Sequence, residues 1–313
     1  MRRVSGFSLF VVLLAAMSAI AASSAHAQPY PVVYNLFVGV PAELTNPGGS
    51  LPGSNDWSCR PSSAHPNPVV LAHGTAANKQ TNWGVYVPLL ANEGYCVYAG
   101  TFGNYVGSPW PNSAMGGMLP IEQSAAQLGD FVDRVLAATG AARVDIVAHS
   151  QGNVYGNYFI KRLGGAAKVD KFVGLAPLWL GSNLLGLGEL GVYSTQLGLK
   201  AAFDGLFGEC QACPQVGQGS DFLRELNADG IYHPDVAYTN IATALDELVV
   251  PYTSGLVPGP GVTNIVVQDG CPTDYSEHAA LGGSPRAAAY VLNALDPAHP
   301  RPVPCEFIPP FTG

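Results

Sequence analysis

The stretch "VDIVAHSQGN", residues 144–153, runs from apolar residues typical of a buried strand into three polar residues and a glycine. Such a break predicts a sharp turn from a strand into a helix, which presents the hydroxyl of Ser150 at the end of a sheet. The turn requires small residues two positions before and after the serine, because the backbone folds past them. Ala148 and Gly152 meet this need. The alternative is an ordinary strand end followed by a helix that Ser150 caps.

Apolar runs and helical patterns alternate along the rest of the chain. Strands are expected at 68–72, 95–99, 144–148, 171–175, 238–243 and 262–268. Helices are expected at 121–136, at 151–163, and from Pro285 to before Pro297. Strands that alternate with helices predict an α/β fold with a mainly parallel sheet, in which sites lie at the carboxyl ends of the strands. Ser150 stands at one of those ends.

The N-terminal residues have the pattern of an export signal. A charged start at Met1 to Arg3 precedes an apolar stretch at 7–22 and a small-x-small triplet at 25–27. We expect 1–27 to be a cleaved signal peptide, because the apolar stretch is short for a membrane span. A retained membrane anchor is the alternative. The mature chain, 28–313, is expected to be secreted as a single domain.

Charge excludes one class of partner. Charged residues make up only 12% of the chain, and its formal net charge is -8. A nucleic-acid partner would require a basic surface, so none is expected.

Six cysteines in an exported chain favour three disulfides over a metal site. Sequence alone leaves fifteen pairings open. Cys96 lies in a strand expected to neighbour the one after Cys59, and a bond from Cys271 to Cys305 would tether a late loop to the tail. The expected pairs are therefore Cys59–Cys96, Cys271–Cys305 and the close pair Cys210–Cys213. Zinc at the close pair is the weaker alternative, because no second close pair accompanies it.

A serine hydroxyl becomes a nucleophile only when a base takes its proton and a carboxylate orients that base. In a strand-turn-helix setting, the carboxylate and the histidine follow the serine along the chain, each after a later strand. Asp246 follows the expected strand at 238–243, and His278 follows the one at 262–268. We expect Ser150, Asp246 and His278 to form a catalytic triad.

Four segments resemble signature positions of the secreted bacterial lipases known as lipase class 2, which have the α/β-hydrolase fold. The segments are PVVLAHGT at 68–75, VDIVAHSQGN at 144–153, DELVVPY at 246–252 and EHAAL at 277–281. Ala148 replaces the first glycine of the general G-x-S-x-G pattern, as in a subset of small bacterial lipases. The resemblance implies hydrolysis of carboxylic esters without a cofactor or a metal. It does not extend to 181–235 or to the residues before Pro68.

The resemblance also places half of an oxyanion hole at His73-Gly74-Thr75. The chemical need is two backbone N–H donors aimed at the oxygen that becomes negative in the transition state. We assign these donors to Thr75 and to Gln151, the residue after the nucleophile. His73 itself is expected to tie down loops.

The remaining histidines and aspartates are weaker candidates. His149 is expected to pack in the core and to point away from the base. His233 precedes Asp246 and so breaks the expected chain order, and His299 lies in a proline-rich tail. Three aspartates are expected to make local hydrogen bonds: Asp145, Asp269 and Asp274. Of these, Asp269 is the second choice for the triad acid.

The segment from Leu178 to Phe207 is apolar and poor in charge. In a secreted hydrolase it suggests a mobile cover or an apolar rim that lines the mouth of the site, within a possible cap at 178–235, and ordinary core helices are the alternative. Gly186, Gly188 and Gly191 match a G-x-G-x-x-G pattern, but no strand-to-helix turn precedes them. No dinucleotide is therefore expected.

Together these features predict a monomeric, secreted serine hydrolase of acyl esters. A triacylglycerol lipase with transient contact to a lipid interface is the first choice. A short-chain esterase, a polyester or cutin hydrolase and an acyltransferase are the alternatives with the same chemistry. The alternative from another class is a secreted binding protein without catalysis, which the intact Ser150, Asp246 and His278 disfavour.

Overall fold

The computed structural model describes residues 29–183 and 210–312. Within these ranges, six parallel strands form one sheet in the order β2-β1-β3-β4-β5-β6. The strands are β1 (Val69–Ala72), β2 (Val97–Ala99), β3 (Val144–His149), β4 (Val169–Leu175), β5 (Ala237–Ala242) and β6 (Val262–Val266). Each strand begins and ends within two residues of the predicted range. The parallel α/β fold is therefore confirmed.

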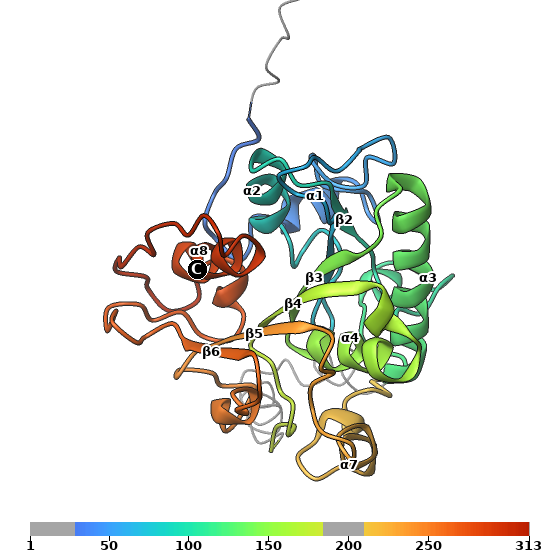
Figure 1. Ribbon diagram of the computed structural model, residues 1–313, viewed down its shortest axis with the longest axis vertical. Helices are drawn as coiled ribbons and strands as arrows, with labels where there is room; N and C mark the ends of the chain where they lie inside the picture. Colours follow the sequence, from blue (N-terminus) through green and yellow to red (C-terminus); the bar gives the residue numbers. More distant parts are fainter. Residues whose placement is uncertain (1–28, 184–209, 313) are drawn as a thin grey trace, which may run out of the picture.

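β1 is apolar along its whole length, and most residues of β3 and β4 are apolar, because helices cover both faces of the sheet. Side chains of β1 and β3 alternate between two cores, with Val70 and Ile146 in one, and Leu71 and Val147 in the other. Two helices pack against each face (Figure 1). They are α3 (Ile121–Thr139) and α4 (Gln151–Arg162) on the first face, and α2 (Tyr86–Asn92) and α8 (Pro285–Leu295) on the second.

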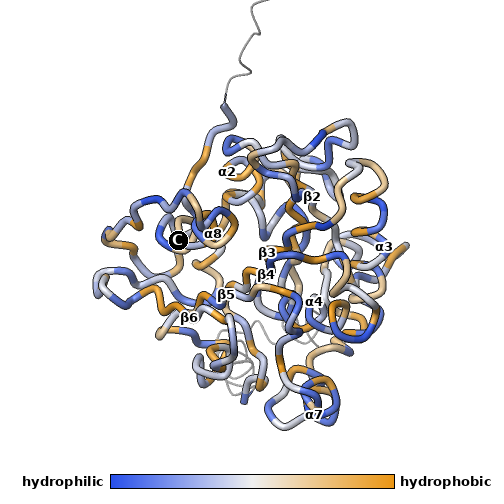
Figure 2. The backbone as a smooth tube through the Cα atoms, in the orientation of Figure 1, coloured by the Kyte–Doolittle hydropathy of each residue, from blue (hydrophilic) through white to orange (hydrophobic). Residues whose placement is uncertain are grey.

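The long helices begin and end at residues that favour helix boundaries. Gly140 ends α3 in the left-handed conformation, with φ 74°. Ser284 caps α8 by accepting a hydrogen bond from the amide of Ala287, and Pro285 is the first residue of this helix. Figure 2 shows hydrophobic and hydrophilic residues alternating along helices such as α4. This pattern is expected of a helix with one face on a core.

Among the described residues, three α-helices have no counterpart in the predictions: α1 (Val40–Thr45), α2 and α7 (Asp221–Leu226). α1 and α7 have six residues each, too few for a periodic pattern. The first five residues of α2 are all buried, so that helix has no polar stripe. The segment before α1 lies beside the C-terminal tail, where the amide of Leu36 donates to the carbonyl of Thr312 at 2.8 Å.

The structure contains the three disulfides expected from the sequence: Cys59–Cys96, Cys210–Cys213 and Cys271–Cys305. The close pair is therefore a disulfide and not a zinc site. The third disulfide joins the loop that carries His278 to the C-terminal tail. The same loop and tail also meet where the amide of Tyr275 donates to the carbonyl of Ile308 at 3.0 Å.

Some predictions fall outside the described residues: the signal peptide at 1–27, the G-x-G-x-x-G glycines, and most of the expected cover from Leu178 to Phe207. Among the helices described, none is long and apolar enough to cross a membrane. Over the same ranges, no group of three histidine, cysteine or acidic side chains could hold a metal ion.

Candidate active site

Ser150 forms the sharp turn between β3 and α4. Its backbone has φ 52° and ψ -125°, and a non-glycine residue in so sparsely populated a conformation costs roughly 1–3 kcal/mol. The amide of Ser150 donates to the carbonyl of Leu175, at the end of β4, at 2.9 Å. The side chain of Asn153 donates to the carbonyls of both residues. These bonds hold the strained turn at the carboxyl edge of the sheet.

Two glycines let neighbouring backbone pass close to this turn. A Cβ atom at Gly152 would lie 2.2 Å from the carbonyl oxygen of Ala72, and one at Gly74 would lie 3.0 Å from the Cβ of Ser150. The expected need for a very small residue after the serine is therefore confirmed at Gly152.

Ser150, His278 and Asp246 lie within hydrogen-bond distance of one another in series. The Oγ of Ser150 is 2.8 Å from Nε2 of His278. The Nδ1 atom of His278 is 2.9 Å and 3.0 Å from the two carboxylate oxygens of Asp246. The structure thus brings together three residues from the loops after β3, β5 and β6, as the chain order predicts.

The charges around His278 determine how readily it takes a proton. Burial alone would lower the pKa of His278, because it disfavours the charged imidazolium. The negative charges of Asp246, Glu247 and Glu277 and the hydrogen bond to Asp246 together outweigh burial, so the pKa of His278 lies above its ordinary value. By contrast, burial lowers the pKa of His73, which has no carboxylate beside it, to about 4. Of these two histidines, His278 is the stronger base.

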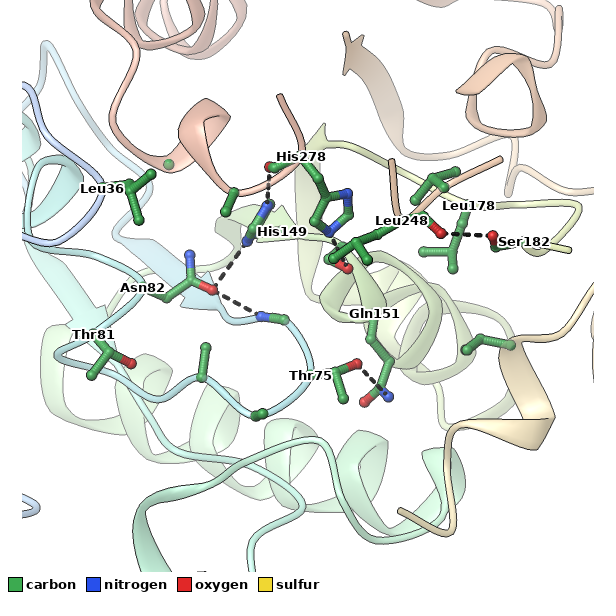
Figure 3. A pocket seen from close by; sticks show the side chains of 18 of the residues that line it. Leu36, Thr75, Thr81, Asn82, His149, Gln151, Leu178, Ser182, Leu248 and His278 are labelled. Carbon is green, nitrogen blue, oxygen red and sulfur yellow. Dashed lines mark hydrogen bonds between the residues drawn. The ribbon is translucent and has the colours of Figure 1, made fainter. Parts of the chain in front are cut away.

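Thr75 and Gln151 line the same cavity as Ser150. Gln151 is the first residue of α4, and the first amides of a helix have no partner within it. Among the described residues, no acceptor takes the amide hydrogen of Thr75. The side chain of Gln151 donates to Oγ1 of Thr75 at 3.0 Å, which ties the two residues together (Figure 3). Both amides are therefore available to an oxygen atom bound beside Ser150.

A cavity of about 400 Å³ lies against Ser150 and His278, and most of its wall is apolar. Figure 3 shows Leu36 on one side of it, with Leu178 and Leu248 on the other. The wall joins the N-terminal segment, the loop after β4 and the loop after β5, which are far apart in sequence. Its large apolar residues are Leu36, Phe37, Val40, Leu178, Val216, Leu248 and Val249. Of the segment expected to line the mouth, Leu178 and Ser182 do so, and 184–207 lies outside the described residues.

The weaker histidine candidates lie elsewhere. His233 precedes β5 and so lies at the amino end of a strand, whereas Ser150 lies at the carboxyl end of one. The ring of His233 accepts a hydrogen bond from the amide of Asp235. His299 pairs with Asp296 on the surface. The site therefore contains neither of them.

The three other aspartates also lie away from the imidazole of His278. Asp145, in β3, contacts Lys171 and Asn67. Asp274 accepts the amide of Ser276, and the carbonyl of Asp269 accepts a hydrogen bond from Arg286. The expected local hydrogen bond is present at Asp274, whereas the partners of Asp145 and of the Asp269 carbonyl are distant in sequence.

The prediction for His149 is wrong. Its ring does not point away from the base but lies 5.1 Å from the ring of His278, centroid to centroid. Its Nε2 is 3.1 Å from the carbonyl oxygen of His278, and its Nδ1 is 3.1 Å from Oδ1 of Asn82. The reason is that His149 is the last residue of β3, at the edge of the sheet where the loop after β6 crosses. His73 does hold a loop as expected, by accepting the amide of Phe102 at 2.9 Å.

Sequence reasoning missed two polar residues of this site. Oδ1 of Asn82 accepts the amide of Gly74 at 3.0 Å, and Oε2 of Glu247 accepts the amide of His278 at 3.2 Å. Glu247 could have been noticed, because it directly follows Asp246 in the DELVVPY segment. No local pattern marks Asn82.

Comparison with known proteins agrees with this geometry. The family model described as Lipase (class 2) matches residues 66–287, more than half of the chain. Triacylglycerol lipases from Pseudarthrobacter phenanthrenivorans and Burkholderia plantarii are each 32% identical to the chain over 96 residues. These matches span 29% of the chain, and 27% and 24% of the respective relatives.

Solved structures of similar fold include two lipases. Aspergillus fumigatus lipase B superposes with a TM-score of 0.59 at 20% identity, covering 82% of this chain and 57% of that one. Bacillus licheniformis lipase BlEst2 in its mature form superposes with a TM-score of 0.54 at 14% identity, covering 80% and 99%. These likenesses bear out the α/β-hydrolase fold.

The close approach at Gly152 generates a stability prediction. The replacement Gly152→Ala should lower the free energy of unfolding by roughly 1–3 kcal/mol, because the added methyl group overpacks against a backbone oxygen that cannot move freely. Urea unfolding followed by circular dichroism measures this. Gly129→Ala is the matched control, since its added Cβ would meet only the ring of Phe159, at 3.2 Å. Equal stability of the two variants would contradict the argument.

Proposed function

The chain belongs to the class 2 lipases, hydrolases of the lipase and esterase family, and on that premise we propose that it is a secreted hydrolase of triacylglycerols or related acyl esters. The observation that carries the proposal is the continuous series Ser150–His278–Asp246 beside an apolar cavity. These three are the proposed catalytic residues, and the amides of Thr75 and Gln151 are the proposed oxyanion hole.

The first half of the proposed reaction acylates the serine. Nε2 of His278 takes the hydroxyl proton of Ser150 as Oγ bonds to the ester carbonyl carbon. The carboxylate of Asp246 stabilises the imidazolium that forms, and the two amides of the oxyanion hole donate to the negative oxygen. When the intermediate collapses, the bond to the alcohol oxygen breaks. His278 gives its proton to that oxygen, and the alcohol leaves.

The second half releases the acid. A water molecule replaces the alcohol and loses a proton to His278 as it attacks the acyl carbonyl. Collapse of the second intermediate returns this proton to Oγ of Ser150 and frees the carboxylic acid. Every group in this cycle is a side chain or an amide of the chain itself, so the proposal includes no cofactor and no metal.

The cavity supports an acyl substrate. Apolar residues lie on both sides of the cavity that Ser150 lines (Figure 3), and a hydrocarbon chain placed there would leave water. Few charged groups line it, so a charged substituent would lose its hydration without compensation. The proposed substrates are therefore esters with an uncharged, apolar acyl chain.

The proposal extends to location and assembly. Three disulfides are typical of proteins from oxidising compartments, which supports export through a signal peptide at 1–27. We further propose that 28–313 is one domain, with a cap at 178–235, and that it works as a monomer in transient contact with a lipid surface.

Loss of the nucleophile tests the reaction. We expect Ser150→Ala to fold normally and to lose roughly four to six orders of magnitude in kcat/KM, the usual scale for a triad nucleophile. His278→Ala should be similarly damaging. Hydrolysis of p-nitrophenyl esters and labelling by a fluorophosphonate probe measure both effects. The control is His233→Ala, and an activity loss confined to this control would overturn the assignment of the base.

The protonation of His278 predicts a pH dependence. Only neutral His278 accepts the serine proton, so kcat/KM should fall as the pH drops through the pKa of His278, which lies above the ordinary value of about 6.5. Asp246→Asn removes the charge that raises this pKa, and the acid limb of its residual activity should move to lower pH. An acid limb that stays in place would contradict the assigned pairing.

The cavity predicts a preference among acyl chains. Burying each methylene contributes roughly 0.8 kcal/mol, so p-nitrophenyl octanoate should exceed the acetate in kcat/KM, with a rise along the series until the cavity is filled. The measurement is initial rates with monomeric esters from two to twelve carbons. A clear preference for acetyl and butyryl esters would contradict the proposed lipase function and favour a short-chain esterase.

A further inference from the structure

The main chain of His278 is held by side chains and not by secondary structure. Its amide donates to Oε2 of Glu247, and its carbonyl oxygen lies 3.1 Å from Nε2 of His149. In the described part of the chain, no backbone group bonds to either atom. The orientation of the imidazole toward Ser150 therefore depends on these two side chains as well as on Asp246.

His149 also contacts the other half of the site. Its Nδ1 lies 3.1 Å from Oδ1 of Asn82, and the same oxygen accepts the amide of Gly74 at 3.0 Å. Gly74 directly precedes Thr75. Figure 3 shows the series from Asn82 through His149 to His278. His149 therefore lies between the loop of the base and the loop of the oxyanion hole.

The protons in this series can be assigned. The amide of Gly74 fixes the oxygen of Asn82 toward His149, so both ring nitrogens of His149 face oxygen acceptors. Burial, followed by the nearby His278, lowers the pKa of His149 to about 3, so the ring is neutral and carries one proton. Oδ1 of Asn82 already accepts a hydrogen bond, whereas the carbonyl of His278 has no other donor among the described residues. We therefore place the proton on Nε2.

We propose that His149 is a positioning residue for catalysis, whose Nε2–H donates to the carbonyl of His278 and keeps the base within hydrogen-bond distance of Ser150. It touches neither the ester nor the transferred proton, and it acts through the main chain of His278. The inference rests on the proposed function, since it assigns a role within that triad.

Two conservative variants separate the two contacts of His149. The side-chain nitrogen of glutamine reaches about as far as Nε2 of histidine, so His149→Gln keeps a donor to the carbonyl of His278. That of asparagine reaches about as far as Nδ1, so His149→Asn places a polar nitrogen near Asn82 and leaves no donor at the carbonyl of His278. His149→Ala removes both contacts.

The expected result is a difference in kcat and not in KM. His149→Ala and His149→Asn should lower kcat by about 10- to 100-fold, the scale of a misplacement near 1 Å, with KM changed less than threefold. His149→Gln should recover most of this loss. His299→Gln, at an exposed histidine, is the control for the replacement itself. Thermal unfolding of each variant checks that the protein is folded.

Equal losses in the glutamine and asparagine variants would overturn the proposal, because they would indicate packing alone. Full activity in the asparagine variant would also overturn it. A third readout needs no turnover: the low-field proton NMR signal of the hydrogen bond between His278 and Asp246 should persist in His149→Gln and broaden in His149→Asn. If the wild type shows this signal but hydrolyses no ester, the proposed function fails, and the positioning role is still decided by the two variants.

Discussion

The strained turn at Ser150 is the constraint on which the arrangement of the site depends. A residue at φ 52° and ψ -125° is stable only when its surroundings hold it there. β4 must end beside the turn, because the carbonyl of Leu175 accepts the amide of Ser150. β1 must end there too, since Gly152 packs directly against the carbonyl of Ala72. β1, β3 and β4 are neighbours in the sheet, so the loops that follow them converge on Ser150.

Most of this fold can be predicted from the sequence, because a parallel sheet covered on both faces produces a simple pattern of apolar residues along the chain. Its strands contain short apolar runs such as Val69–Ala72, and its large helices carry one apolar stripe and recognisable ends, as in α3 and α8. The predictions fail where burial removes the contrast. The start of α2 is buried throughout and includes Pro88, so neither a polar face nor a helix propensity marks it. α1 and α7 have six residues each, too few to show an apolar periodicity.

The same reasoning separates the predictable part of the site from the rest. Ser150, Asp246 and His278 could be found because each follows a strand and their order is set by topology. The contacts of His149 could not be predicted, because they depend on which loop crosses the end of β3. Its partner His278 is 129 residues away in sequence. The N-terminal segment also gives no local sign that Leu36 and Phe37 reach the cavity. Their position follows from the pairing of that segment with the C-terminal tail.

Three buried histidines lie close to one another at this edge of the sheet, and their surroundings give them different tasks. Burial lowers the pKa of His73 to about 4 and that of His149 to about 3, so both stay neutral and serve as hydrogen-bonding partners for loops. His278 is equally buried, but a carboxylate faces its Nδ1, and its pKa is raised. In the proposed reaction, a neutral His149 neither competes for the proton of Ser150 nor repels the imidazolium that forms on His278. The loop after β5 supplies both Asp246, which raises the pKa of His278, and Glu247, which holds its amide. A single loop therefore selects which of the three histidines can act as the base.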